Sequence, residues 1–181
     1  MARETTGKPA RRRKRAPAPL LFYVSGRRAA LEAISAGRAR ELAVVTGARG
    51  QVEEVRAAAE VAGIPIRAVE RGAFAALGRE GDAVAARVDL PPVLSEGDLA
   101  HRSYPDDAIV VVLDGVTDPQ NLGAAARSAE AAGAALLVTR QHRSAPVTPA
   151  AVRASSGALL HLPHARVANI PRALGRLQGL E

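Results

Sequence analysis

A continuous run of aliphatic and β-branched residues, AIVVVL at positions 108–113, limits the fold of this chain more than any other feature. Such a run is typical of a strand that is buried on both faces of a parallel sheet. A polar loop over residues 114–120 and a helix over residues 121–132, which Gly133 ends, are predicted to follow it. A second apolar run over residues 135–139 completes a strand–loop–helix–strand unit. This order predicts a parallel, right-handed crossover and therefore an α/β fold.

Residues 20–90 show a shorter alternation of the same kind and predict a small α/β domain. The expected helices cover residues 26–36, 51–62 and 71–77, and the expected strands cover residues 41–46, 65–69 and 83–88. Residues 91–107 contain paired prolines, a Tyr-Pro step and two final acids, which is the composition of an interdomain linker. We therefore predict that a second domain covers residues 108–181.

The second domain is predicted to continue in short elements. We expect a short helix near residues 150–155, an apolar stretch over residues 159–162 and a last helix over residues 169–177. Asn169 is the expected N-cap of that last helix, and Pro171 is expected in its first turn.

The positive charge of the chain lies mostly at its N-terminus. The net charge is +7, and residues 1–19 hold seven Lys and Arg against one Glu. Five of these cations are adjacent, namely Arg11, Arg12, Arg13, Lys14 and Arg15. Their mutual repulsion and the neighbouring prolines predict a disordered basic arm. Two interpretations fit the arm: an RNA-binding tether whose affinity comes from counterion release, and a solubilising tail without a specific partner.

Composition excludes several classes of protein. Without cysteine the chain forms no disulfide and no thiolate metal site, and its four histidines show no metal-binding spacing, so we expect no metal. The longest apolar runs are too short to span a membrane, and no apolar signal segment follows the charged N-terminus. These features predict a cytoplasmic protein.

Residues 113–133, LDGVTDPQNLGAAARSAEAAG, hold the polar groups that could carry chemistry. They follow a predicted parallel strand, where ligands of such sheets bind, and the helix start offers N–H groups to a phosphate. Asn121 begins this helix and Arg127 is its long cation, although for Asn121 taken alone helix capping is the better explanation. Arg127 could equally pair with Glu130 on the helix surface, and Gly123 could serve only tight helix–sheet packing. A nucleotide-binding α/β domain is disfavoured, because the chain has no glycine-rich phosphate loop.

The whole string is more specific than its parts. VVVLDGVTDPQNLGAAARSAEAAGA, residues 110–134, resembles the first signature motif of the SpoU family, within the SPOUT class of knotted methyltransferases. SSGALLHLPHARVANIPRAL, residues 155–174, looks like the segment that follows in that family. YVSGRRAALEAI, residues 23–34, is weakly similar to the ribosomal-protein-like RNA-binding domain that often precedes the catalytic domain.

This resemblance implies transfer of a methyl group from S-adenosylmethionine to a ribose 2′-hydroxyl of ribosomal or transfer RNA. The fused architecture is similar to enzymes that modify a guanosine of large-subunit ribosomal RNA. Asn121 and Arg127 match the motif's asparagine and catalytic arginine, so the resemblance implies that both are catalytic. A guanidinium stays protonated near neutral pH and is a poor general base. We therefore expect Arg127 to hold the target phosphate and stabilise the developing alkoxide, with Asn121 positioning Arg127 or the ribose.

The family's later motifs, a Gly-Glu loop and a Ser-Leu-Asn-type segment, have no counterpart here and are expected beyond Glu181. In the family these segments form the trefoil knot and most contacts to the donor. The expected fold is thus a small α/β RNA-binding domain followed by an incomplete parallel-sheet SPOUT domain that lacks the knot.

Three expectations about the chain alone follow from that departure. We expect no donor-binding residue, no activity, and a monomer or an aggregate in place of the homodimer that the family forms. The alternative function is that of a noncatalytic RNA-binding protein or a degenerate fragment.

Overall fold

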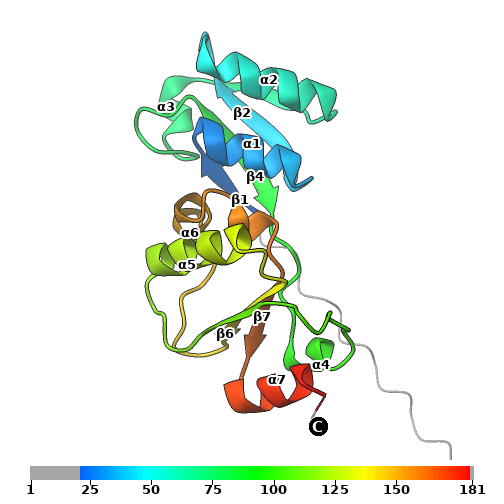
Figure 1. The fold of residues 1–181 in the computed structure, drawn as a ribbon. Helices are drawn as coiled ribbons and strands as arrows, with labels where there is room; N and C mark the ends of the chain where they lie inside the picture. The colour runs from blue at the N-terminus through cyan, green and yellow to red at the C-terminus, as the bar shows by residue number, and fades with distance from the viewer. Residues whose placement is uncertain (1–20, 180–181) are drawn as a thin grey trace, which may run out of the picture.

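The computed structural model of the protein describes residues 21–179, which form two sheets with helices on their faces (Figure 1). The α/β class predicted from the sequence is confirmed. The first sheet lies in the upper part of the molecule in Figure 1, and the second sheet lies in the lower part. Within the described residues, none of the helices combines the length and the apolar character that a membrane crossing requires.

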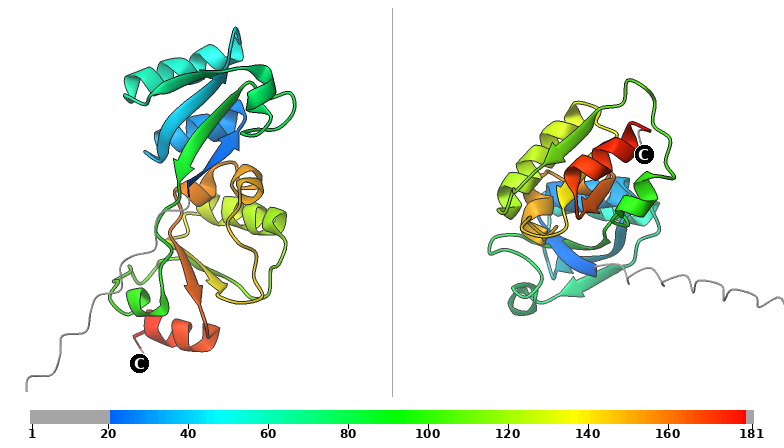
Figure 2. Two further views of the ribbon diagram at one scale, coloured as in Figure 1. Left: turned by 180° about the vertical axis from the view of Figure 1, so that it is seen from behind. Right: turned by 90° about the horizontal axis from the view of Figure 1, so that it is seen from below.

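The upper part contains seven elements. They are β1 (Leu21–Ser25), α1 (Arg27–Ser35), β2 (Ala39–Val45), α2 (Gln51–Val61), β3 (Ile66–Val69), α3 (Arg71–Phe74) and β4 (Val84–Asp89). The strand order is β1-β4-β2-β3; β4 is antiparallel to both neighbours, and β2 is parallel to β3. Helices α1 and α2 cover one face of this sheet, whereas α3 lies against the other (Figures 1 and 2).

The lower part contains eight elements. They are α4 (Glu96–Leu99), β5 (Val110–Leu113), α5 (Pro119–Ala131), β6 (Leu136–Arg140), α6 (Pro149–Ala154), the 3-10 helix η1 (Ala158–Leu160), β7 (His164–Val167) and α7 (Ile170–Leu177). The strands are parallel in the order β5-β6-β7, so the predicted parallel pairing of the first two runs is confirmed. Strand alternation places Leu137 in the core with α5 and α6, and Leu136 and Val138 in the core with α7 and α4.

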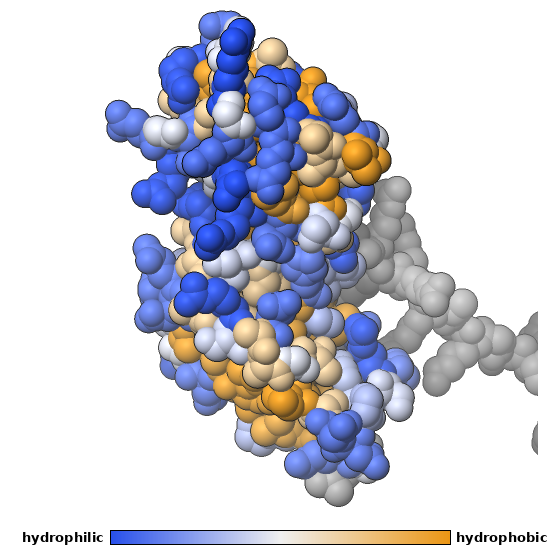
Figure 3. Space-filling view, turned by 45° about the horizontal axis from the view of Figure 1, so that its top comes forward, coloured by the Kyte–Doolittle hydropathy of each residue, from blue (hydrophilic) through white to orange (hydrophobic). Residues whose placement is uncertain are grey.

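Strand β5 departs from its prediction. All four of its residues are half-buried, not buried on both faces, and Ile109 just before it is 47% exposed. The reason is its position, because in the described part of the chain β5 pairs only with β6 and forms an edge of the sheet. On the face shown in Figure 3, apolar residues gather at the surface of the lower part of the molecule, while the upper part is mostly hydrophilic.

Three elements were not predicted. They are β1, β7 and α4, and α4 lies within the segment expected to be a linker. A capping box starts α4: the Ser95 hydroxyl accepts from the Asp98 backbone N–H, and the Asp98 carboxylate accepts from the Ser95 backbone N–H. Leu94 in the same segment pairs with Ala165 of β7. By contrast, the prediction that Asn169 caps the last helix, with proline in its first turn, is confirmed.

The two parts of the molecule share one apolar core. Its members come from α1 and the first sheet on one side and from α5, α6 and η1 on the other. At the surface of this contact, Nε2 of His161 lies 3.4 Å from Oε2 of Glu32. Gly157, with φ +94°, lies against the Glu32 side chain so closely that an added Cβ would meet Glu32 Cγ at 2.7 Å. The contact therefore requires glycine at position 157 for both conformation and space.

Replacement of Gly157 by alanine is expected to lower the free energy of unfolding by about 2–4 kcal/mol, because left-handed strain adds to overpacking. Gly133 provides the matched control, since it has φ +75° and nothing within 4 Å of an added Cβ. Its alanine variant is expected to lose only about 1 kcal/mol of unfolding free energy, which is the cost of the left-handed strain alone. Urea unfolding of both variants measures the difference, and equal losses would show that α1 does not lie on position 157 in solution.

Candidate functional site

The start of α5 is held by Asp118, not by Asn121. The Asp118 carboxylate accepts hydrogen bonds from the backbone N–H groups of Gln120 at 3.3 Å and Asn121 at 3.1 Å. Pro119 follows as the first helical residue, where its missing N–H costs nothing. The interpretation of Asn121 as a helix cap is therefore wrong, and its side chain is left available for another role.

Asn121 and Arg127 are both exposed on α5. Six residues of α-helix separate them, which corresponds to about 9 Å along the axis and about 240° around it. The helix therefore places the two side chains on different rows of its exposed surface. Within residues 21–179, the Arg127 side chain forms no hydrogen bond or ion pair, so the alternative pairing with Glu130 is not present.

The buried side of α5 depends on Gly123. A Cβ at this position would meet the Ala151 carbonyl oxygen, Ala154 Cβ at 2.7 Å and the Ser155 backbone nitrogen at 2.9 Å. The close approach is thus between α5 and the turn at the end of α6, not between helix and sheet as the sequence suggested. It fixes the helix that carries Asn121 and Arg127.

Replacement of Gly123 by alanine is expected to lower the free energy of unfolding by about 1–3 kcal/mol, because the contact atoms on α6 are mostly backbone. Gly72 in α3 is the control, since nothing lies within 4 Å of an added Cβ there and its φ is ordinary. Its alanine variant is expected to gain up to about 1 kcal/mol through helix propensity alone. Urea unfolding checks both values. A gain at both positions would contradict the close approach of α5 to α6.

Polar side chains converge at the carboxyl ends of β5, β6 and β7. Arg140 at the end of β6 forms an ion pair with Asp114, just after β5, with Nε 2.5 Å from Oδ1. Arg166 of β7 donates from Nη2 to the Gln141 carbonyl oxygen at 2.8 Å. This edge is where open parallel sheets bind ligands. The sequence analysis identified the loop after β5 but not Arg140 and Arg166. These two arginines reach the carboxyl edge of the sheet only through the register of the strands.

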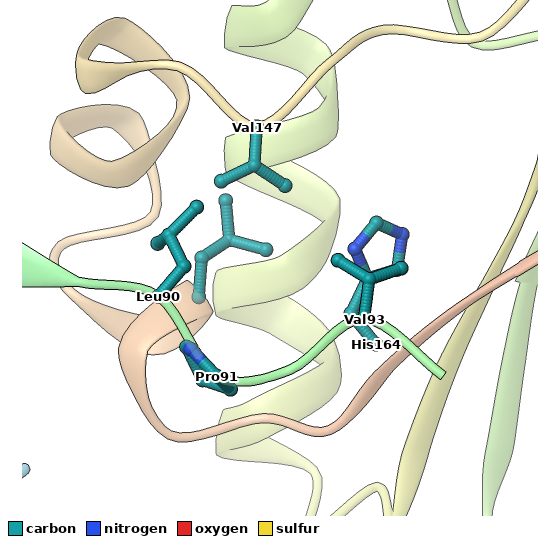
Figure 4. Close-up of a pocket in the computed structure, with 6 residues that line it drawn as sticks. Leu90, Pro91, Val93, Val147 and His164 are labelled. Atoms are coloured by element: carbon teal, nitrogen blue, oxygen red, sulfur yellow. The ribbon is translucent and has the colours of Figure 1, made fainter. Parts of the chain in front are cut away.

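A buried histidine lies deeper in the same sheet. His164 is 5% exposed, and its Nε2 lies 2.8 Å from the Thr139 hydroxyl. Burial, with a smaller contribution from the nearby Arg166 guanidinium, lowers the pKa of His164 from 6.5 to about 4. The adjacent cavity, lined by Leu90, Pro91, Val93, Val147, Leu159 and His164 (Figure 4), has a volume of about 10 Å³. It holds at most one water, so His164 is a structural group and not part of a ligand site.

A larger cleft, of about 500 Å³, lies between α7 and the segment before β5. Its lining includes Tyr104, Val110 and Leu177. Val110 begins β5, so the cleft is at the opposite end of the strand from the polar edge. Within the described residues, no group of three His, Cys, Asp or Glu side chains could hold a metal ion. The basic run from Arg11 to Arg15 lies outside the described residues.

Residues 108–180 match the model of the SpoU rRNA Methylase family. The chain is 37% identical over 125 residues to the 23S rRNA (guanosine-2'-O-)-methyltransferase RlmB of Vibrio parahaemolyticus, a match that covers 66% of this chain and 49% of that protein. The protein of the same name from Xanthomonas campestris is 34% identical over 148 residues, which is 79% of this chain and 59% of that protein. The chain therefore spans about half the length of the curated relatives it matches.

The fold is similar to that of solved methyltransferases. The crystal structure of the SpoU methyltransferase AviRb from Streptomyces viridochromogenes in complex with AdoMet aligns with a TM-score of 0.68 at 26% identity, over 88% of this chain and 58% of that chain. An AdoMet-bound rRNA methyltransferase from Sinorhizobium meliloti aligns with a TM-score of 0.67 at 23% identity, over 88% of this chain and 59% of that chain. The second alignment is a likeness of fold alone.

Proposed function

Residues 108–180 of this chain belong to the SpoU rRNA methylase family, and on this premise we propose that the protein transfers a methyl group from S-adenosylmethionine to a ribose 2′-hydroxyl of ribosomal RNA. The match of these residues to the family is the observation that carries the proposal. The names of the Vibrio and Xanthomonas relatives support a guanosine of large-subunit ribosomal RNA as the target.

Arg127 is proposed to bind RNA and stabilise charge in this reaction. As the ribose oxygen becomes a nucleophile, negative charge develops on it, and a guanidinium with no partner in the described structure is available to meet that charge. The same fork can donate two hydrogen bonds to a phosphate. A guanidinium is a poor general base, so the hydroxyl proton leaves to another group or to solvent.

Asn121 is proposed to orient the ribose or Arg127. Its amide both donates and accepts, which suits a sugar hydroxyl, and Asp118 already serves the cap that would otherwise occupy it. The separation of the two side chains around α5 favours contact with different parts of one nucleotide over direct contact with each other.

The methyl donor supplies the group to be transferred, and neither of the two cavities described among residues 21–179 suits it. The cavity beside His164 is too small, and the larger cleft lies at the wrong end of β5. We therefore attribute no donor contact and no step at the donor to residues 21–179.

The remaining parts of the proposal concern organisation and partners. We propose that residues 20–90 form an RNA-binding domain, that residues 91–107 connect it to a methyltransferase domain starting at residue 108, and that the basic arm of residues 1–19 tethers RNA. The arm is supported by its charge. A cytoplasmic location is proposed, and the family resemblance supports a homodimer for an intact enzyme of the family and not for this chain alone.

The test is transfer of labelled methyl groups from S-adenosylmethionine to ribosomal RNA by an intact enzyme that includes these residues, followed by nucleoside analysis. Label is expected in 2′-O-methylguanosine, and a DNA oligonucleotide of the same sequence, which lacks the 2′-hydroxyl, is expected to accept none. RNA binding without transfer at saturating donor would favour the noncatalytic alternative. Label on a base instead of the ribose would overturn the proposal.

A further inference from the structure

The loop formed by residues 141–145 lies across the carboxyl edge of the parallel sheet and is held on both sides. Its Gln141 N–H donates to the Val167 carbonyl oxygen at the end of β7, at 2.8 Å. Its Ala145 N–H donates to the Val116 carbonyl oxygen in the loop after β5, also at 2.8 Å. A loop with fixed ends can present side chains in a defined arrangement.

Cations dominate the side chains at this loop. Arg140 precedes it, Arg143 lies within it, and Arg166 contacts it through the Gln141 carbonyl oxygen. Asp114 is the carboxylate that pairs with Arg140. Arg143 is exposed, and its side chain has no hydrogen bond or ion pair within the described part of the chain. Three guanidinium groups and one carboxylate therefore lie at this loop, and the sum of their charges is positive.

Two buried donors of this loop and of the neighbouring strand have no hydrogen-bond partner among residues 21–179. They are Nε of Arg166 and the Ser144 hydroxyl. A buried donor without a partner costs free energy, and such groups are few in folded proteins. Arg143 also has φ +55°, a conformation that non-glycine residues rarely adopt and that concentrates at functional sites. Strain, unsatisfied donors and excess positive charge thus coincide on one loop.

We propose that Arg140, Arg143, Ser144 and Arg166, here named the anion cluster, bind a backbone phosphate of the RNA substrate. The shared chemistry is that of a phosphate oxyanion, which accepts charge-assisted hydrogen bonds from guanidinium groups such as the exposed one of Arg143. Asp114 neutralises the charge of Arg140, so Arg143 supplies the positive charge that remains for the phosphate. The inference rests on the proposed function, and it makes the anion cluster a positioning site, separate from Arg127, for the strand that carries the target ribose.

The first test measures affinity for a fluorescently labelled single-stranded RNA oligonucleotide as a function of salt, using the full chain. Each phosphate contact that is lost should reduce the slope of log K against log salt by about 0.7. Arg143→Ala is expected to show that reduction. Arg102→Ala, which removes an exposed cation from the connecting segment before β5, is expected to keep the original slope.

A stability measurement separates binding from folding. Arg143→Gly removes the same side chain but relieves the positive-φ strain, so its melting temperature is expected to rise by a few degrees while the salt slope falls. A fall in both would mean that Arg143 acts through the fold, and the proposal would be wrong.

Inorganic phosphate distinguishes the two sources of the anion. Millimolar phosphate is expected to raise the melting temperature of the unaltered chain more than that of Arg143→Ala. If phosphate stabilises the chain but the RNA slope is unchanged by Arg143→Ala, the cluster takes free phosphate and the RNA assignment fails. If the slope is unchanged while methyl transfer to RNA proceeds, the proposed function stands without the cluster. If the unaltered chain binds no RNA at all, the proposed function itself fails.

Discussion

In an intact enzyme that includes these residues, replacement of Arg127 by alanine is expected to reduce the rate of methyl transfer at saturating substrates by about 10²- to 10³-fold, the usual cost of removing one donor to a developing oxyanion. The structure supports a functional and not a structural role, because the side chain is exposed and forms no contact that the fold requires among residues 21–179. Unfolding should therefore be little changed. Single-turnover methyl transfer and urea unfolding of the same preparation measure the two effects.

Lysine at position 127 separates charge from geometry. It keeps the positive charge but lacks the planar fork, so Arg127→Lys is expected to recover only part of the lost rate. Glu130→Gln is the matched control, since Glu130 is exposed on the same helix one turn later, and its variant should transfer methyl groups normally. Weakened donor binding by Arg127→Ala, with a normal rate at saturating donor, would contradict the role proposed for this arginine.

The regular elements that the sequence predicts well are those whose hydrophobic pattern is complete. β6 opens with three consecutive apolar residues, and α5 combines a polar start, small core residues and a glycine stop. β7 was missed because it has only four residues and presents His164 and Arg166 to one face, with Ala165 and Val167 on the other. A strand is usually recognised by apolar residues at alternate positions. In β7 the polar His164 occupies a buried position, so the hydrophobic pattern is too weak to predict the strand.

The candidate site also contains residues that the sequence could predict and residues that it could not. Asn121 and Arg127 belong to one helix and one motif, so the sequence alone could place them together. The anion cluster could not be found in this way, because Arg140 and Arg166 come to one loop only through the parallel register of β6 and β7. Asp118 shows a further limit: Asp and Asn are equally good caps, and only the hydrogen bonds decide which of the two begins the helix.

Protonation of His164 is expected to lower the stability of the fold as the pH falls below neutral. The folded pKa, about 4, lies below the unfolded value of 6.5, so above pH 6.5 both states bind no proton on this ring and the stability is complete. Between pH 6.5 and 4 only the unfolded state gains a proton. The free energy of unfolding should fall by about 2–3 kcal/mol by pH 4.5 from this group alone.

Comparison of variants isolates that contribution, because carboxylates also titrate in this range and do so alike in every variant. His164→Gln removes the titrating ring and keeps a polar group near the Thr139 hydroxyl, so its stability should depend less on pH by the stated amount. His142→Gln, at an exposed position, should behave as the unaltered protein does. Urea unfolding at pH 7.5 and 4.5 measures all three. If His164→Gln does not fold, titration of the His164 ring by NMR replaces it, and a midpoint near 6.5 in the folded protein would show that burial does not hold this ring neutral.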